Sequence, residues 1–307
     1  MRNTVINTIF QQAQLNKDII FITADLGYSV IENFQRELPE QFINVGIAEQ
    51  NMIGLAAGLA LAGKKVFVYS IVPFVTLRCL EQIKVDICYQ NLDITIIGVG
   101  GGFAYGSLGV THHAIEDLGV MRTLPNMKVV APSDPEEAKK LITKLIDIGG
   151  PAYLRLNRGG EKNIISEIEQ QSFKFGEGRK IRGGGEILIL AIGAILENAL
   201  TAVEKLAEQK IIVSLVSLPV LKPLNKEYLE KIVKEKKVLI TLEEHNIIGG
   251  LGSAVAEFIA ERGIEIKFKR LGVLDTYPSE IGRQDYLREL FNLSADKITE
   301  VILGLIK

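Results

Sequence analysis

The chain is poor in the residues that build metal centres, disulfide frameworks and acid–base networks. Among its 307 residues it has two cysteines, three histidines and no tryptophan. Neither Cys79 nor Cys88 stands in a C-x-x-C or other metal-ligand spacing, which argues against zinc and dithiol redox sites. The two cysteines look unpaired, and the start of the sequence has no apolar leader segment. Both features predict a protein of the reducing cytoplasm. Proton transfer by histidine is limited to His112, His113 and His245.

Long apolar runs and a surplus of one charge are also missing. The longer apolar runs, such as 187–195, are far shorter than the roughly 20 residues that span a bilayer, so we expect no membrane partner. The net charge is −2, which gives no reason to expect a nucleic acid partner. With 47% apolar and 23% charged residues, the composition is that of an ordinary globular protein.

Short apolar runs alternate with segments of helical spacing in the first half of the chain. Five runs have the length and the Val/Ile content of buried strands, at 19–23, 65–70, 93–99, 128–131 and 152–156. Continuous apolar strands separated by helices are typical of a parallel sheet with helices on both faces. The first half therefore predicts an α/β domain.

A change in composition follows this first alternation. Residues 159–185 are rich in glycine and charge and have no strong periodicity, which is typical of a connection between domains. The alternation then resumes, with strands expected at 186–192, 211–218, 237–242 and 264–271. The sequence predicts an α/β fold of two doubly wound domains, at 1–165 and 186–307, joined by a linker at 166–185.

One carboxylate has a conspicuous setting. The segment 44–52, N-V-G-I-A-E-Q-N-M, places Glu49 just before an apolar, small-residue helix expected over 53–62. A negative charge near a helix N-terminus is stabilised by typically ~0.3–1 kcal/mol. Position alone permits a purely structural role, since acids are common in first turns.

A glycine-rich block at 100–117 carries His112 and His113. A dinucleotide-binding spacing begins at Gly98 and Gly100 but has Phe103 in place of its third glycine, so that motif is incomplete. Adjacent histidine side chains diverge on most backbones, which argues against a shared metal. His112 either caps the helix expected to begin at 114–117 or takes part in catalysis.

Three further segments carry candidate residues. Arg158 follows the strand expected at 152–156, where a guanidinium can bind phosphate or simply face solvent. The segment 76–83, T-L-R-C-L-E-Q-I, includes Arg78. The segment 241–255 contains E-E-H-x-x-x-G-G-L-G, in which we interpret His245 as structural or interfacial.

Together these segments resemble the transketolase family. The string around Glu49 is similar to the glutamate segment of the family's thiamine-diphosphate pyrimidine-binding domain, and 241–255 resembles the signature of its C-terminal domain. The resemblance covers essentially the whole chain and extends to deoxyxylulose-phosphate synthases and to the β subunits of 2-oxoacid dehydrogenase E1. It implies a pyrimidine-binding domain followed by a smaller transketolase C-terminal domain.

The resemblance also implies roles for single residues. Glu49 is the acid that contacts N1′ of the cofactor's aminopyrimidine and activates it. His112 falls on the position that lines the substrate channel, where an imidazole transfers protons and stabilises an alkoxide. Arg158 falls on the arginine that binds the substrate phosphate.

The pyrimidine pocket of the family includes the helix that carries Arg78 and an aromatic ring stacked on the cofactor. In this chain the matching position for the ring is Val72, and Phe74 lies nearby. We therefore expect Phe74 to be the stacking residue and Arg78 to belong to the cofactor site.

Only one half of a transketolase is present. The half that binds the diphosphate through Mg²⁺, usually marked by G-D-G and a later asparagine, has no counterpart in this sequence. The resemblance thus implies an enzyme active only with an N-terminal partner subunit, which supplies the Mg²⁺ ligands. The natural assembly is an α₂β₂ heterotetramer, because closed two-fold symmetry is common; we expect no metal site in this chain.

Two positions depart from the family pattern. Leu108 stands where an aspartate usually recognises a sugar hydroxyl, and Gly100-Gly101 stand where deoxyxylulose-phosphate synthases have an Asp-Arg pair. We expect transfer of a two-carbon ketol unit from a ketose or ketose phosphate to an aldose, with an altered donor or acceptor. A 2-oxoacid dehydrogenase E1 β subunit, a non-catalytic assembly or regulatory subunit and a lone flavodoxin-like module remain as alternatives.

Overall fold

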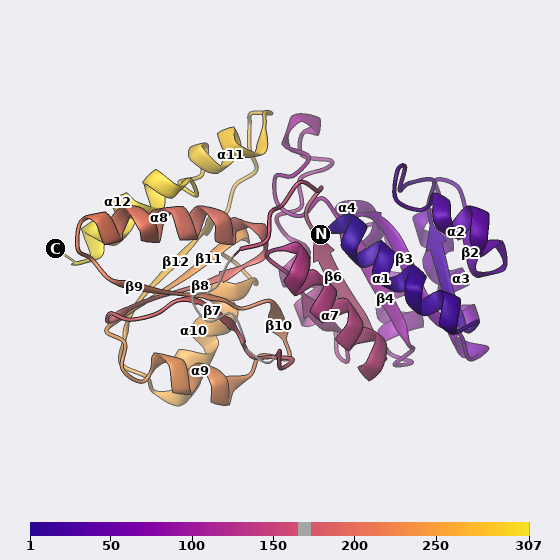
Figure 1. Ribbon diagram of the computed structural model, residues 1–307, viewed down its shortest axis with the longest axis horizontal. Coiled ribbons are helices and arrows are strands. Elements are labelled where there is room, and N and C mark those ends of the chain that lie inside the picture. Colours follow the sequence, from indigo (N-terminus) through magenta and orange to yellow (C-terminus); the bar gives the residue numbers. More distant parts are fainter. Residues whose placement is uncertain (165–172, 307) are drawn as a thin grey trace.

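Two β-sheets organise the chain, one in each half (Figure 1). The computed structural model describes residues 1–164 and 173–306. The first sheet has seven strands in the order β10-β5-β6-β4-β3-β1-β2: Val220–Lys222, Lys128–Val130, Ala152–Leu156, Ile94–Val99, Lys65–Ile71, Ile19–Thr23 and Phe42–Asn44. The second has five in the order β12-β11-β8-β9-β7: Lys267–Val273, Val238–Asn246, Ile187–Ile192, Val213–Ser217 and Arg179–Arg182.

The helices cover both sheets. The α-helices are α1 Arg2–Leu15, α2 Glu32–Glu37, α3 Glu49–Leu61, α4 Val72–Val75, α5 Leu80–Gln82, α6 Asp117–Thr123, α7 Pro135–Ile148, α8 Leu196–Glu208, α9 Lys226–Val233, α10 Leu251–Arg262, α11 Gln284–Leu290 and α12 Ala295–Ile306. The shorter turns are the 3₁₀ segments Pro39–Gln41, Gly106–Leu108 and Gly193–Ile195 and the π-helical segment Ile83–Cys88. In the part of the chain that the structure describes, no helix is long and apolar enough to cross a bilayer.

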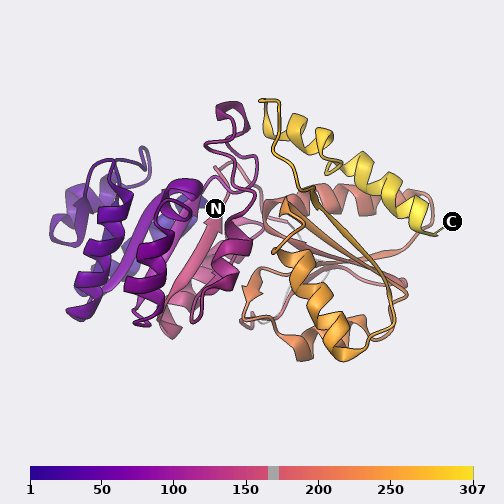
Figure 2. The same cartoon turned by 180° about the vertical axis from the view of Figure 1, so that it is seen from behind.

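The first sheet is buried on both faces, as its continuous apolar strands predict. β1 to β6 are mutually parallel, and every residue of β1, β4 and β6 is buried. Side chains that point one way from β1, such as Phe21, pack with α1 and α7, which lie on the face seen in Figure 1. Ile20 and Ile22 point the other way and pack with α3, on the face seen in Figure 2.

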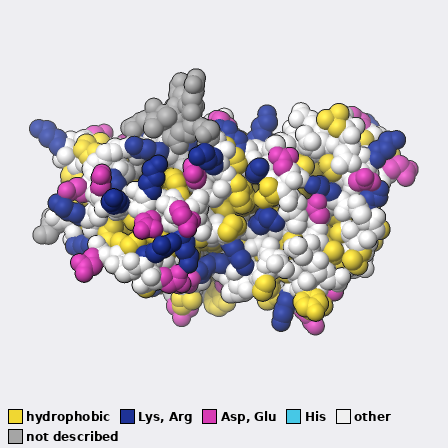
Figure 3. Space-filling model, turned by 90° about the horizontal axis from the view of Figure 1, so that it is seen from below, with side chains coloured by type: hydrophobic (Ala, Val, Ile, Leu, Met, Phe, Trp, Pro, Cys, Tyr) yellow, Lys and Arg dark blue, Asp and Glu magenta, His cyan; other side chains and the backbone are white. Residues whose placement is uncertain are grey.

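The second sheet is mostly parallel, with β7 as an antiparallel edge strand. Residues of α8 and α12 pack together on one face, and residues of α9 and α10 pack on the other. On the surface in Figure 3, Lys and Arg side chains are interspersed with Asp and Glu side chains over both halves. The predicted fold class, two α/β domains with a mostly parallel first sheet, is confirmed.

The connection between the halves has more structure than the sequence suggested. Within the range expected as a linker, 166–185, residues 179–182 form β7 and pair with β9. Positions 165–172, which are the last residue of the first predicted domain and the start of the predicted linker, lie outside the described residues, as does position 307. A strand of the second half, β10, pairs antiparallel with β5 of the first sheet. The exact domain boundaries stay a prediction.

Several helices differ from the sequence expectations. The helix expected at 53–62 begins four residues earlier, so that Glu49 is its first residue. Residues 77–89, whose apolar side chains Leu80, Ile83 and Ile87 have helical spacing, are divided in the structure between α5 and the π-helical segment Ile83–Cys88. The helices α1, α11 and α12 were not among the sequence expectations. The weak amphipathic pattern of α1 explains the first omission, since its buried residues include Thr8 and its exposed residues include Leu15.

Candidate active site

The predicted site residues gather at one edge of the first sheet. Because β1 to β6 are parallel, their carboxyl ends share this edge, and ligands of α/β proteins bind at such edges. Glu49 follows β2, Phe74 and Arg78 follow β3, His112 follows β4, and Arg158 follows β6. Five side chains from four separate segments of the sequence are thus delivered to the same side of the domain.

Glu49 is the most buried of these five residues. It begins α3, and only 2% of its surface is exposed. Arg78 Nη1 donates to Glu49 Oε2 at 2.6 Å, and Ser70 Oγ donates to Oε1 at 3.2 Å. A carboxylate has about four acceptor positions, so this anchored acid keeps capacity for a further donor.

Phe74 lies directly beside this pair. The guanidinium carbon of Arg78 lies 4.3 Å from the centroid of the Phe74 ring, a cation–π contact. Phe74 is half-buried, whereas Val72, the position that matches the family's ring, is fully buried in the core. Of these two side chains, only Phe74 is accessible to a ligand.

His112 continues the row beyond Phe74. Its ring packs edge-on against Phe74 with centroids 5.1 Å apart, and against Tyr105 at 6.2 Å. Thr111 Oγ1 lies 3.0 Å from His112 Nδ1, which leaves Nε2 as the free nitrogen. Burial, and then the neighbouring His113, lower the pKa of His112 below its ordinary value, so the neutral imidazole is favoured.

The alternative roles for the two histidines do not fit the structure. The cap of α6 is Glu116, not His112. His113 is buried, with Nε2 at 3.0 Å from the carbonyl oxygen of Gly106 and its ring against Phe103. Over residues 1–164 and 173–306, no group of three or more His, Cys, Asp or Glu side chains is placed to hold a metal ion.

Arg158 completes the row at the end of β6. It is exposed, and its guanidinium carbon lies 5.5 Å from the centroid of the Tyr105 ring. The contacts thus run without a break from Glu49 through Arg78, Phe74, His112 and Tyr105 to Arg158. Sequence reasoning missed Tyr105; an aromatic residue inside a glycine-rich loop was the signal that could have identified it.

The glycines before this loop are explained by close packing. A Cβ at Gly100, whose φ is +93°, would lie 2.2 Å from the Tyr105 ring. A Cβ at Gly101 would lie 2.1 Å from Arg155 Nε, a poorly exposed side chain that cannot move aside easily. The Asp-Arg pair expected in deoxyxylulose-phosphate synthases therefore has no room at Gly100-Gly101.

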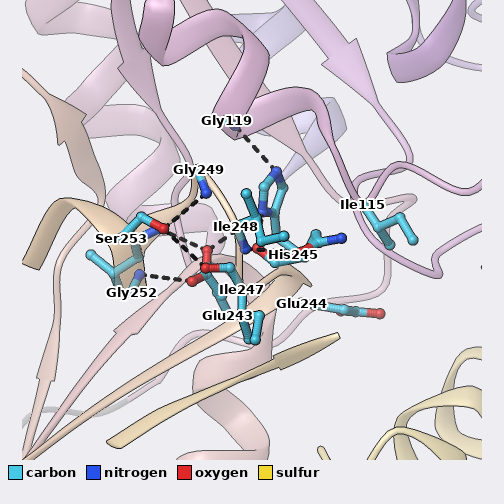
Figure 4. A network of polar contacts seen from close by, with 12 residues as sticks. Ile115, Gly119, Glu243, Glu244, His245, Ile247, Ile248, Gly249, Gly252 and Ser253 are labelled. Atoms are coloured by element: carbon cyan, nitrogen blue, oxygen red, sulfur yellow. Dashed lines mark hydrogen bonds and ion pairs between the residues drawn. The ribbon is translucent and has the colours of Figure 1, made fainter. Parts of the chain in front are cut away.

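The segment 241–255 builds contacts between the two halves (Figure 4). His245 is fully buried; Gly119 N donates to its Nε2 at 3.2 Å, so the proton lies on Nδ1, 2.6 Å from the Asn246 carbonyl oxygen. Burial lowers the pKa of His245, which keeps this ring neutral. The structural role expected for His245 agrees with these contacts.

Comparison with known proteins identifies the family. Residues 1–160 match the model of the transketolase pyrimidine-binding domain, and residues 176–298 match that of the transketolase C-terminal domain. The chain belongs to the transketolase family. It is 38% identical to one subunit of the apulose-4-phosphate transketolase of Actinobacillus succinogenes, over 99% of this chain and 98% of that protein.

Two further members of the transketolase family differ in the share of their own length that this chain matches. A solved structure of a split-gene transketolase, described as an inactive β4 tetramer, has a TM-score of 0.88 and 34% identity, covering 99% of this chain and 97% of that one. The 1-deoxy-D-xylulose-5-phosphate synthase of Syntrophus aciditrophicus is 36% identical, but the match covers 96% of this chain and only 45% of that protein.

The row suits one part of thiamine diphosphate, the cofactor implied by the transketolase family. A buried carboxylate with spare acceptor capacity, a half-buried aromatic ring and a neutral imidazole fit an aminopyrimidine and the reacting carbon next to it. The row itself contributes one buried carboxylate, already paired with Arg78, and no cluster of metal ligands. Its donor set therefore fits the pyrimidine end of the cofactor and not the Mg²⁺-diphosphate end.

Proposed function

We propose that this chain is the C-terminal subunit of a split, thiamine-diphosphate-dependent transketolase that transfers a two-carbon ketol unit. The observation that carries the proposal is the unbroken row of contacts from Glu49 to Arg158 at the carboxyl edge of the first sheet. A non-catalytic subunit would have no need to hold an acid, a ring, an imidazole and a guanidinium in register.

Glu49, Phe74 and Arg78 form the cofactor end of the row. Thiamine diphosphate, when bound, supplies the carbanion chemistry that breaks and forms the C–C bond. Glu49 would accept a hydrogen bond from N1′ of the pyrimidine in its protonated form, and the half-buried Phe74 would provide the stacking surface. Arg78 orients the carboxylate through its 2.6 Å contact.

His112 and Arg158 form the substrate end. Because Thr111 engages Nδ1, His112 uses Nε2 to accept the proton of the donor hydroxyl as the C–C bond breaks, and returns a proton to the acceptor. Its lowered pKa keeps it ready to act as a base at neutral pH. Arg158, exposed at the end of β6, binds a phosphate or another acidic group of the sugar.

A second subunit completes the site. We infer an N-terminal partner that carries the diphosphate-binding half and the Mg²⁺ ligands, in an α₂β₂ heterotetramer. Support comes from the A. succinogenes relative, which is named as one subunit of its enzyme, and from the β4 assembly of the split-gene relative, which is described as inactive. Exposed apolar side chains near the row, Ile47 at 81% and Val110 at 52%, are available for such a partner to cover.

The donor differs from that of a standard transketolase. Leu108, at the position of the usual sugar-binding aspartate, is 52% exposed and can offer no hydrogen bond to a hydroxyl. The donor is therefore a ketose that lacks that hydroxyl or presents it to the partner subunit. Apulose 4-phosphate, named for the A. succinogenes relative, belongs in the first panel of sugars, together with xylulose 5-phosphate.

The proposed compartment is the cytoplasm. Cys79 and Cys88 are buried free thiols. Burial raises the pKa of Cys79 to about 12 and that of Cys88 to about 11, so both stay protonated and unreactive. Neither thiol is needed for the proposed reaction.

The decisive experiment is purification of the tagged chain from its native cells, followed by assay of bound protein and thiamine diphosphate. A stoichiometric partner that carries the diphosphate half, together with bound cofactor and ketol transfer from one sugar of the panel, is the expected result. Decarboxylation of 2-oxo acids by the same complex would instead indicate a dehydrogenase E1 β subunit. A chain that holds no cofactor when purified, and still holds none when Mg²⁺ and the partner are added, would indicate a non-catalytic subunit.

A further inference from the structure

The loop that carries His112 is closed by a narrow neck. Gly102 and Ala114 exchange both backbone hydrogen bonds, each at 2.9 Å, so that residues 103–113 form an excursion from the end of β4. His112 lies two residues from this neck. Its position therefore depends on how firmly the neck is held.

A carboxylate from the other half of the molecule reaches into this neck. Glu244 lies on β11 of the second sheet, is 6% exposed, and accepts from the backbone N–H of Phe103 at 2.9 Å through Oε1. Arg288 Nη2 donates to Glu244 Oε2 at 2.7 Å, and Gln284 Nε2 lies 3.0 Å from each carboxylate oxygen. Two side chains of α11 thus fix the carboxylate that fixes the loop.

The backbone of Glu244 is tied to the same neck. Arg155 Nη2 donates to the carbonyl oxygens of Ala114, at 3.0 Å, and of Glu244, at 2.7 Å. Gly102 has a φ of +63°, and a Cβ there would lie 2.6 Å from Glu244 Cδ. The carboxylate therefore lies directly against the neck, with no space for an intervening side chain.

The adjacent residue Glu243 offers a natural contrast. It is fully buried, and its oxygens accept from the N–H groups of Leu251 and Gly252, both at 2.7 Å, at the start of α10 (Figure 4). Successive residues of a strand point to opposite faces, so Glu243 serves its own half while Glu244 faces the His112 loop. Two neighbouring buried carboxylates thus have separate partners.

We propose that Glu244 is a positioning residue of the active site, which holds the His112 loop from the second half of the molecule. The proposal rests on the proposed function of His112. It assigns to the C-terminal domain a direct part in shaping the active site, in addition to assembly.

The physical reason is that removal of this carboxylate leaves the buried N–H of Phe103 without its acceptor and the buried Arg288 guanidinium without its carboxylate, with Asn198 as its remaining acceptor. The neck relaxes to satisfy Phe103 N and Arg288 elsewhere, and the loop moves with it. Catalytic groups tolerate little displacement, since a shift of about 1 Å can cost about 100-fold in rate. Loss of Glu244 therefore lowers turnover more than it lowers binding of a substrate through Arg158.

The first test needs no partner subunit and no activity. Amide hydrogen exchange is measured on the full chain for E244A, E244Q and the matched control E243A. E244A is expected to speed exchange of the 102–114 amides by about tenfold or more, and E244Q by less, because its amide oxygen still accepts from Phe103. E243A is expected to speed exchange at 251–254 and to leave 102–114 unchanged.

The second test uses the complex with the partner subunit. E244A is expected to lower kcat by about tenfold or more with the donor KM changed less than threefold, and E244Q to recover most of the rate. The chain has three histidines, so His112 can be followed by NMR once H112Q identifies its signal. Its titration is expected to move toward the ordinary histidine range in E244A and not in E243A.

The outcomes separate the positioning role from the proposed function. If E244A speeds exchange only at the 102–114 amides, but the wild-type complex shows no ketol transfer, the positioning role of Glu244 stands and the proposed function is overturned. The positioning role would be overturned if the wild-type complex is active and the E244A complex keeps the wild-type kcat. It would also be overturned if E244A speeds amide exchange no more at 102–114 than elsewhere in the chain. Equal effects of E243A and E244A on kcat and on the 102–114 amides would also overturn it.

Discussion

At the scale of single residues, Glu49 has a different setting from an ordinary first-turn acid. Such acids are usually exposed and worth little, whereas Glu49 is 2% exposed and bonded to both Ser70 and Arg78. A buried carboxylate costs free energy unless it is paired with a positive charge or hydrogen-bonded. The contact with Arg78 satisfies the charge and leaves acceptor capacity for a ligand.

Replacement of Glu49 by glutamine tests the acid directly. E49Q keeps the shape and one acceptor for Arg78 but loses the carboxylate, so kcat of the holo-complex is expected to fall by about 100-fold or more. The measurement is ketol transfer at saturating cofactor. E197Q, a change of an exposed first-turn acid of α8, is the matched control and should leave kcat unchanged. Full activity of E49Q would favour a non-catalytic subunit.

The pH profile tests His112. Burial and His113 lower its pKa, so the base form persists to a lower pH than for an ordinary histidine. As pH falls through that lowered pKa, the imidazole gains a proton and the rate should fall, which places the acid limb of kcat below about pH 6.5. H112Q should reduce kcat by about 100-fold or more and remove this limb. An acid limb that persists unchanged in H112Q would exclude His112 as its source.

At the scale of elements, the start of α7 joins the two halves. Asp134 is the N-cap of α7, fully buried, and accepts from Glu137 N at 2.8 Å. Its other oxygen pairs with Arg179 of β7, and Arg179 Nε lies 3.5 Å from Glu137 Oε1. The local sequence P-S-D-P-E-E at 132–137 is typical of a capped helix start, but it gives no sign of the partner 45 residues away.

Removal of Asp134 should therefore destabilise the chain strongly. D134A leaves the poorly exposed Arg179 without its main partner and α7 without its cap, and the expected loss in free energy of unfolding is about 3–5 kcal/mol. Urea unfolding of the chain measures it. E136A, on the same helix turn, breaks only the exposed pair with Lys140 and should cost less than about 1 kcal/mol. Equal midpoints for the two variants would show that the buried pair adds no stability.

At the scale of the whole molecule, the two sheets are not independent. β10 comes from the second half of the chain but forms the edge strand of the first sheet, next to β5. Glu244 and His245 add further contacts from β11 to the His112 loop and to α6. The halves therefore share a sheet edge as well as an interface.

Because the halves share a sheet edge, they should unfold together. The chain is expected to unfold in one cooperative transition, with a calorimetric enthalpy close to the van't Hoff enthalpy. A fragment of residues 1–164 lacks β10 and leaves the edge of β5 open, so it should aggregate or melt well below the whole chain. Scanning calorimetry of both proteins makes the comparison. Two resolved transitions in the whole chain, one matching the fragment, would contradict the expectation.

The sequence by itself determined the α/β class and the approximate position of most strands, and it supplied the candidate site residues that the fold brings to one edge of the first sheet. The strand runs are local, continuous and rich in Val and Ile, and the motifs around Glu49, His112 and Arg158 are short segments of specific composition. Helix starts were less exact, since Glu49 begins a helix whose pattern suggested a later start. Tyr105 was missed although it is an aromatic residue inside a glycine-rich loop, because its contacts with His112 and Arg158 form only in the folded chain.

Only the tertiary structure decided which residues meet. The side chain of Phe74, and not that of Val72, is accessible to a ligand, because the turn after β3 buries Val72 in the core. Glu244 contacts the His112 loop, 141 residues away at Phe103, because β11 ends beside the neck. Such contacts depend on strand order and on the packing of one half against the other, and these are set by the whole chain at once rather than by any local pattern.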